Sequence, residues 1–179
     1  AIGQGATTVT PLSLALAYGA LSNGGTVFVP QIVRALETAE GAVAQEFAPR
    51  VRRKVETPQE DVQRVNTALY DVLNDPKGTA YPVRDPSLEI TGKTGTAQTG
   101  YVATAKDDPK QAWYQARDHA WFAAFAPSKS PEIAVVVLVE HGGSGPTQAA
   151  PVAVQVVKEY ERLKADRKAG IKHPAPGGP

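Results

Sequence analysis

The amino-acid sequence predicts an α+β fold with a largely antiparallel sheet flanked by helices. Two continuous apolar runs, residues 121–126 and 133–139, are joined by a short connector rich in proline and serine, which suits an antiparallel hairpin. Unbroken apolarity in both runs predicts strands that are covered on both faces. Helical patterns stand before these runs and after them, so helices are expected to provide the cover.

The first element is expected to be a helix over residues 10–22. Thr10 can cap the first turn, and Pro11 suits the first helical position. The apolar side chains of this segment fall on more than one face, which predicts burial on several sides. A short strand is expected at residues 26–30, and residues 32–36 are expected to continue it after a break.

A second helix is predicted over residues 57–74, after a basic run at residues 50–54 that is expected to be a solvated strand or loop. Thr57 and Glu60 have the spacing of a capping box, with Pro58 just inside the helix. Apolar residues then recur at steps of three and four, which predicts a single buried stripe. The stripe consists of Val62, Val65, Leu69, Val72 and Leu73.

The remaining elements complete the sheet and its cover. Residues 88–98 predict a strand, whereas residues 99–119 are polar, show no sustained period and are expected to form a long surface insertion. Pro151 opens a last helix, and the tail over residues 169–179 is expected to be disordered because it is rich in proline and glycine. The inward face predicted for the last helix consists of Val152, Val156, Tyr160 and Leu163.

Composition and charge narrow the classes of function. The 179 residues suit one domain, and a net charge of +1 gives no electrostatic case for a nucleic-acid partner. The absence of cysteine excludes disulfides, thiolate metal sites and a cysteine nucleophile. The chain contains no methionine and opens at Ala1, so it is expected to be a piece of a longer protein.

Motifs that suggest other chemistry fail on spacing. A phosphate-binding loop needs glycine where Ser87 stands, and the residues after Lys93 are poor helix formers. A serine-hydrolase elbow around Ser144 needs glycine where Pro146 stands, so a hydrogen bond within the loop between His141 and Ser144 explains this stretch better. The histidines match no metal-ligand spacing, so neither a metal nor another cofactor is expected. They are His119, His141 and His173.

Residues 92–98, G-K-T-G-T-A-Q, favour serine acyl transfer instead. In an extended strand Thr94 and Thr96 point to one face, where two hydroxyls can reach a single carboxylate. Gly95 leaves room for a peptide substrate against the backbone. Lys93 supplies positive charge at the strand end, and the amide of Thr96 is available as an oxyanion donor. Lys93 and Thr96 are therefore the catalytic candidates, and Thr94, Gly95 and Thr96 are the substrate-binding candidates.

Several further segments around this motif carry the resemblance to a known family, together with their order along the chain. They are residues 2–5, 10–12, 17–18, 23–25, 92–98, 119–122, 125–127 and 139–143. In this order they resemble class B penicillin-binding proteins, for which K-T-G is a signature element. The resemblance runs from about residue 2 to 165. Among class B enzymes, the chain is most similar to the elongation type, because Ala97 and Gln98 continue the motif and a long insertion precedes His119.

The resemblance implies a partial penicillin-binding-protein/serine β-lactamase-like transpeptidase fold. Residues 1–168 would be the C-terminal portion of a transpeptidase domain, and residues 169–179 its tail. The implied activity is that of a serine-type D,D-transpeptidase that cross-links peptidoglycan and is acylated by β-lactams. The implied partners are stem peptides that end in D-Ala-D-Ala and membrane proteins of cell elongation. The implied location is the periplasmic face of the inner membrane, through an N-terminal anchor outside this chain.

The sequence departs from the family pattern at the nucleophile. No serine is followed by lysine three places on or by asparagine two places on, so the S-x-x-K and S-x-N elements are expected before Ala1. The chain alone is therefore predicted to be inactive and not to bind penicillin covalently. Two alternatives stay open. One is a fragment of a serine β-lactamase or D,D-carboxypeptidase, and the other is a non-catalytic module that recognises D-Ala-ended peptides or partner proteins.

Overall fold

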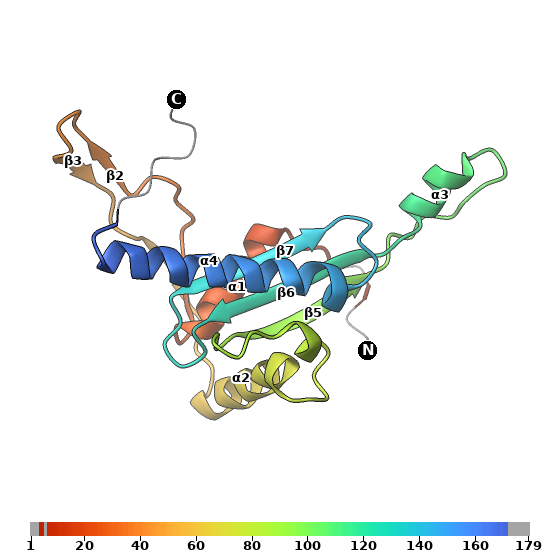
Figure 1. The fold of residues 1–179 in the computed structure, drawn as a ribbon, viewed down its shortest axis with the longest axis horizontal. Helices are drawn as coiled ribbons and strands as arrows, with labels where there is room; N and C mark the ends of the chain where they lie inside the picture. The colour runs from red at the N-terminus through yellow and green to blue at the C-terminus, as the bar shows by residue number, and fades with distance from the viewer. Residues whose placement is uncertain (1–3, 6, 172–179) are drawn as a thin grey trace.

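A computed structural model describes residues 4, 5 and 7–171, and its centre is a three-stranded antiparallel sheet (Figure 1). The strands are β5 (Thr91–Ala97), β6 (His119–Ala126) and β7 (Ile133–Val139). Their order is β5-β6-β7, so β5, which carries the K-T-G motif, is an edge strand.

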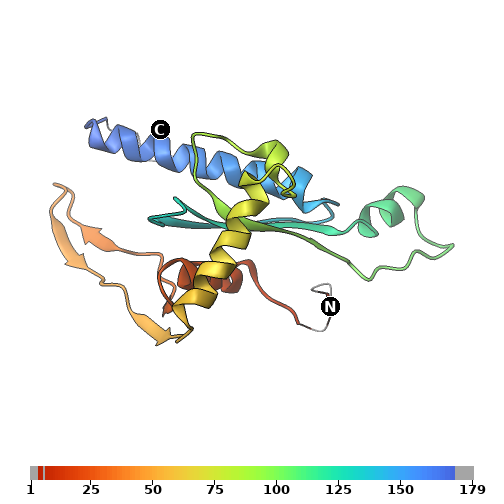
Figure 2. The same cartoon turned by 90° about the horizontal axis from the view of Figure 1, so that it is seen from below.

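Helices lie on both faces of this sheet. Viewed along its edge, the sheet lies between α4 (Ala150–Lys168) and α1 (Pro11–Ser22), while α2 (Gln59–Asn74) lies beside β5 (Figure 2). Thr10 caps α1 as predicted, because its hydroxyl oxygen accepts a hydrogen bond from the amide of Ser13 at 3.1 Å. The predicted α+β fold with a largely antiparallel sheet flanked by helices is confirmed.

The β6–β7 hairpin has the predicted form. Its strands pair without interruption from Ala120 opposite Val139 to Ala126 opposite Ile133. Every residue from Phe122 to Ala126 is buried, which is what an unbroken apolar strand between two helical layers requires.

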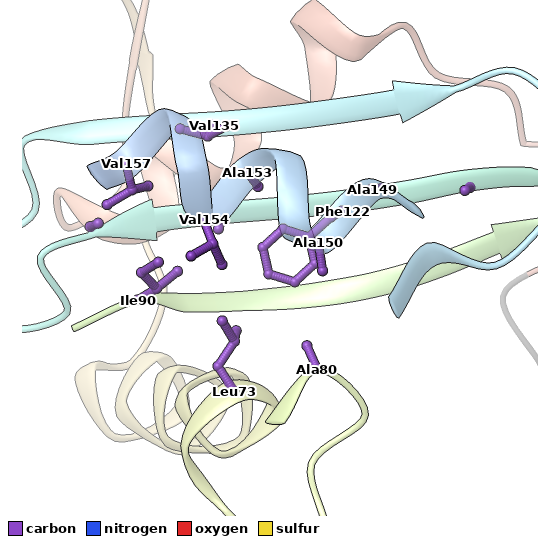
Figure 3. Close-up of a cluster of buried hydrophobic side chains, with 13 residues drawn as sticks. Leu73, Ala80, Ile90, Phe122, Val135, Ala149, Ala150, Ala153, Val154 and Val157 are labelled. Carbon is purple, nitrogen blue, oxygen red and sulfur yellow. The ribbon is translucent and has the colours of Figure 1, made fainter. Parts of the chain in front are cut away.

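The core lies between the sheet and α4, with α2 closing one side (Figure 3). The ring of Phe122 is 0% exposed and lies against the small side chains of Ala149 and Ala150. Leu73 of α2 reaches the same cluster. Alanines at the start of α4 let its backbone approach the sheet closely, so this part of the core is dense without large side chains on the helix.

The predicted inward face of α4 is wrong at Val152 and Val156, whereas Tyr160 and Leu163 are half-buried. Val152 and Val156 are 43% and 42% exposed, whereas Val154 and Val157 are buried. The buried face is centred on Ala153 and its neighbours. Because apolar residues surround the first half of α4, the positions of the large side chains do not reveal the inward face, and close packing selects the side with the alanines.

The predicted capping box of α2 is also wrong. The helix begins at Gln59, Pro58 is the N-cap, and no side chain caps the first turn. Glu60 instead lies 3.8 Å from Arg64 as an exposed ion pair one turn along the helix. Proline therefore occupies the N-cap position, where it has no hydroxyl to offer, and Thr57 lies one residue before the position that a capping box requires. Leu73 is the buried residue of the predicted stripe, and Val65 is exposed.

Two smaller sheets lie apart from the central one. β1 (Thr26–Phe28) pairs with β4 (Val51–Lys54), whose residues are all exposed, as predicted for a solvated basic strand. β2 (Ala35–Glu37) pairs with β3 (Val43–Glu46) in a hairpin that projects from the body (Figure 1). Residues 32–36 therefore do not continue β1. Their strand pairs locally instead, across a turn containing Gly41 at a φ of 84°.

The polar insertion contains a helix that the sequence pattern did not reveal. α3 (Pro109–Gln115) is too short to show a period, but Asp108 caps it by accepting hydrogen bonds from the amides of Lys110 and Gln111. The insertion extends from one end of the sheet (Figure 1). β6 begins at His119, two residues earlier than the predicted apolar run.

The segment between α2 and β5 contains the short 3₁₀ helix η1 (Tyr81–Val83) and is joined to α4. Asp85 accepts hydrogen bonds from Ser87 and Lys158, which lower the pKa of this carboxyl to about 2. Most of the predicted tail, residues 172–179, lies outside the described residues, as do residues 2 and 3 of the first motif segment. Within residues 4, 5 and 7–171, no helix combines the length and apolar character needed to cross a bilayer.

Candidate functional site

The open edge of β5 presents backbone groups of alternate residues. The carbonyl oxygen of Thr94 accepts a hydrogen bond from Lys93 Nζ at 3.0 Å, and that of Thr96 accepts one from Gln4 Nε2 at 3.2 Å. The amide of Gln98 donates to Gln4 Oε1 at 3.1 Å. In an antiparallel strand, the N–H and C=O of one residue point to the same side. The Thr96 N–H therefore also points away from β6, toward the open edge.

Lys93 is exposed at this edge, and its ammonium folds back onto the next carbonyl. It lines a hollow of about 300 Å³ between β5 and the end of α2, together with Thr79 and the acidic residues Asp71 and Asp75. Lys93 therefore lies within β5 and not at the strand end as predicted, but its charge is accessible from solvent.

The two motif hydroxyls are each held by a different neighbour. Thr94 Oγ1 lies 2.9 Å from Thr79 Oγ1, in the loop after α2. Thr96 Oγ1 accepts a hydrogen bond from the amide of Gly145 at 3.4 Å. Gly145 begins a single turn of π-helix, η2 (Gly145–Ala149), which leads into α4. The strand, the α2 loop and the start of α4 therefore meet at the motif.

Glycines permit the close approach of these backbones. A side chain on Gly145 would overlap the carbonyl oxygen of Gly95 and lie 2.6 Å from that of Trp121. A side chain on Gly95 would lie 3.1 Å from Trp121 Cβ. Packing within the protein thus also explains a glycine at position 95, which the sequence analysis attributed to room for a substrate.

Substitution of Gly145 by alanine is expected to reduce both stability and activity. The new methyl group would meet rigid backbone atoms, so the strand and η2 must separate, at a typical cost of about 1–3 kcal/mol. The separation would displace Thr96, and acylation of the complete protein by benzylpenicillin is expected to slow by at least roughly tenfold.

The measurements are thermal unfolding and the rate of acylation. Gly19→Ala in α1 is the matched control, because a side chain there meets no atom within 4 Å and alanine favours the helix. If Gly145→Ala unfolds at the wild-type midpoint temperature and is acylated at the wild-type rate, the contact between Gly145 and β5 does not hold Thr96 in place.

The loop before Gly145 is tied to the insertion. The amide of His141 donates to His119 Nδ1 at 2.9 Å, and His141 adopts a φ of 52° to do so. Arg117 donates to the carbonyl of Gly142 at 2.8 Å. The expected hydrogen bond between His141 and Ser144 is therefore replaced by one to His119, which lies opposite the last residue of β5. The loop that contains His141 is therefore held by a residue 22 positions away in the sequence, and not by a neighbour within the loop as predicted.

The residues predicted from the sequence, Lys93, Thr94, Gly95 and Thr96, all lie on β5. The groups that contact this strand, Gln4, Thr79 and Gly145, were not predicted. Gln4 belongs to a segment used for the resemblance, and Gly145 lies two residues after another, but nothing in their spacing indicated contact with β5. Of the histidines, His119 and His141 are neighbours, and His173 lies outside the described residues.

Most of the chain is similar to known proteins. The penicillin binding protein transpeptidase domain family matches residues 1–158. The peptidoglycan D,D-transpeptidase MrdA of Acinetobacter baumannii is 39% identical over 155 residues, which are 84% of this chain but 23% of that protein. The chain thus spans about a quarter of the length of such curated relatives.

Solved structures show the same fold. The imipenem acyl-enzyme of penicillin-binding protein A from M. tuberculosis superposes with a TM-score of 0.70 at 27% identity, over 89% of this chain and 32% of that one. The complex between penicillin-binding protein PBP2 and MreC from Helicobacter pylori gives a TM-score of 0.68 at 27% identity, over 90% of this chain and 26% of that one.

Proposed function

Because this chain belongs to the penicillin-binding protein transpeptidase domain family, we propose that it forms the carboxylate-binding and oxyanion-binding side of a peptidoglycan D,D-transpeptidase of the elongation type. The observation that carries the proposal is the open edge of β5, where Lys93 is exposed and the Thr96 N–H points away from β6. The names of the matched relatives favour a transpeptidase over a β-lactamase or a carboxypeptidase.

Each motif residue receives a role at this edge. The hydroxyls of Thr94 and Thr96 bind the terminal carboxylate of a stem peptide ending in D-Ala-D-Ala, and Lys93 supplies the opposing charge. Gly95 has no side chain, which leaves room for a peptide to lie against the strand. The Thr96 N–H donates to the carbonyl oxygen as it becomes an oxyanion.

The nucleophile comes from elsewhere in the complete protein, since no serine of this chain stands in an S-x-x-K sequence. Its hydroxyl oxygen attacks the penultimate D-Ala carbonyl, its proton passes to a neighbouring base, and the terminal D-Ala leaves as the amine. An amine of a second stem peptide then takes the acyl group and releases the serine. A β-lactam acylates the same serine, and its ring nitrogen takes the place of the leaving amine.

The proposed activity also implies where this protein works and what it binds. A cell-wall cross-linking enzyme acts outside the cytoplasm, so this part of the protein works in the periplasm. The Helicobacter pylori PBP2 structure contains MreC, which supports a protein of cell elongation as the partner. We assign no cofactor to the reaction.

Fluorescent penicillin labelling tests the function. The complete protein is expected to be labelled in a one-to-one ratio and to release D-Ala from a stem pentapeptide, whereas residues 1–179 alone are expected to remain unlabelled. Substitution of the upstream serine by alanine is the control for covalent attachment. A folded complete protein that takes up no penicillin would contradict the proposal. Binding of a D-Ala-D-Ala peptide without any acylation would favour the non-catalytic module instead.

A further inference from the structure

We infer that Thr79, which lies outside the K-T-G motif, is a positioning residue for carboxylate recognition by Thr94, and this inference rests on the proposed function. The two Oγ1 atoms are 2.9 Å apart, although the residues are 15 positions apart in the chain. Thr79 is exposed and lines the same hollow as Lys93, of about 300 Å³. The pair therefore stands at the open edge and not in the core.

The end of α2 is fastened to β5, which keeps Thr79 within reach. Asn74 Nδ2, in the last turn of α2, donates to the carbonyl of Ile90 at 3.2 Å, one residue before β5 begins. The same amide group donates to the Tyr70 carbonyl at 2.8 Å. This bridge fixes the distance between the helix and the strand on the side where Thr79 and Thr94 meet.

The residues on either side of Thr79 are equally constrained. A side chain on Gly78 would overlap the carbonyl oxygens of Asp71 and Val72 and lie 2.7 Å from the carbonyl carbon of Val72. The amide of Ala80, which is fully buried, donates to the Val72 carbonyl at 2.9 Å. The chain thus turns tightly against α2 at Thr79, and the loop has little freedom to carry its hydroxyl elsewhere.

The chemistry of hydroxyl groups determines which partner donates the hydrogen bond between Thr79 and Thr94 when a carboxylate is bound. A threonine hydroxyl has one proton to donate and two lone pairs that accept, whereas an ionised carboxylate can only accept. When a substrate carboxylate arrives, Thr94 must turn its proton toward it. Thr79 can then donate to the freed lone pair of Thr94, which polarises the Thr94 hydroxyl and strengthens its bond to the carboxylate.

The test compares Thr79→Val and Thr79→Ser in the complete protein, with benzylpenicillin as the probe. Valine keeps the shape of threonine and removes the hydroxyl, whereas serine keeps the hydroxyl. We expect Thr79→Val to weaken the initial binding of benzylpenicillin roughly five- to twentyfold, with the acylation rate constant changed by less than about twofold. Thr79→Ser should remain within about twofold of the wild type.

A matched control comes from α2. Thr67 is also exposed, and its hydroxyl donates to the Gln63 carbonyl at 3.0 Å, away from β5. Thr67→Val should bind benzylpenicillin as the wild type does. With the methyl ester of benzylpenicillin, which has no carboxylate charge, the wild type and Thr79→Val should be equal.

A double-mutant cycle shows whether Thr79 acts through Thr94. In a Thr94→Val background, Thr79→Val should have no further effect on binding. The inference is overturned if the two effects multiply, if Thr79→Val binds as the wild type, or if Thr79→Ser is as weak as Thr79→Val. A folded wild type that benzylpenicillin does not acylate overturns the proposed function, and this inference with it. Acylation of the wild type with unaffected Thr79 variants overturns the inference alone.

Discussion

Replacement of Lys93 by alanine is expected to slow acylation of the complete protein by benzylpenicillin on the order of a hundred- to a thousandfold. The reason is that the ammonium stands at the open edge of β5 and holds only a backbone carbonyl. None of the ion pairs among residues 4, 5 and 7–171 involves Lys93, so its charge is available to a ligand carboxylate. Lys93→Arg should recover part of the rate, because arginine keeps the charge but changes the geometry.

The measurement is the second-order acylation rate, with thermal unfolding as a check on folding. Lys129→Ala is the control, because Lys129 is also exposed near the central sheet and lies 3.5 Å from Glu89 in an ion pair. That variant should react as the wild type. A Lys93→Ala protein that reacts at the wild-type rate would show that the motif lysine does not contact the ligand.

Replacement of Phe122 by alanine is expected to lower the free energy of unfolding by about 3–5 kcal/mol. The ring is 0% exposed and fills the space between β6 and α4 (Figure 3). A side chain on Gly92 would lie 2.9 Å from its Cζ atom, so the ring also supports the strand that carries the motif. The substitution therefore leaves a cavity directly beneath β5.

Denaturant unfolding of the complete protein provides the measurement. Trp113→Ala is the control, because Trp113 is 65% exposed on α3 and its loss should change stability by less than about 0.5–1 kcal/mol. Loss of less than about 1 kcal/mol in Phe122→Ala would mean that the sheet and α4 close over the vacant space.

The sequence predicted those features whose signals are local. Thr10 and Pro11 mark the start of α1 within two residues, and the β6–β7 hairpin is visible because both apolar runs and their connector are consecutive. The motif residues Lys93 and Thr96 were found for the same reason. Periodicity failed where several faces are apolar, as in α4, and where the helix is only seven residues long, as in α3.

The groups that hold the motif could not be found in this way. Thr79 contacts Thr94 across 15 residues, Gly145 contacts Thr96 across 49, and Gln4 contacts Thr96 across 92. No hydrophobic period and no helix cap in the sequence links Gln4 or Gly145 to β5. Such contacts arise only when the sheet, α2 and the start of α4 have assembled, so they follow from tertiary packing and not from any local pattern.

The edge of β5 has a consequence for how this protein can evolve. The Thr96 N–H and C=O belong to peptide bonds, so no amino-acid replacement except proline, which would remove the N–H, can delete them. Any other mutation can alter them only by shifting the strand, and β5 is paired with β6 from Thr91 to Ala97, with Gly92 packed closely against the backbone of β6. The peptide groups are therefore less open to removal by mutation than the side chains around them.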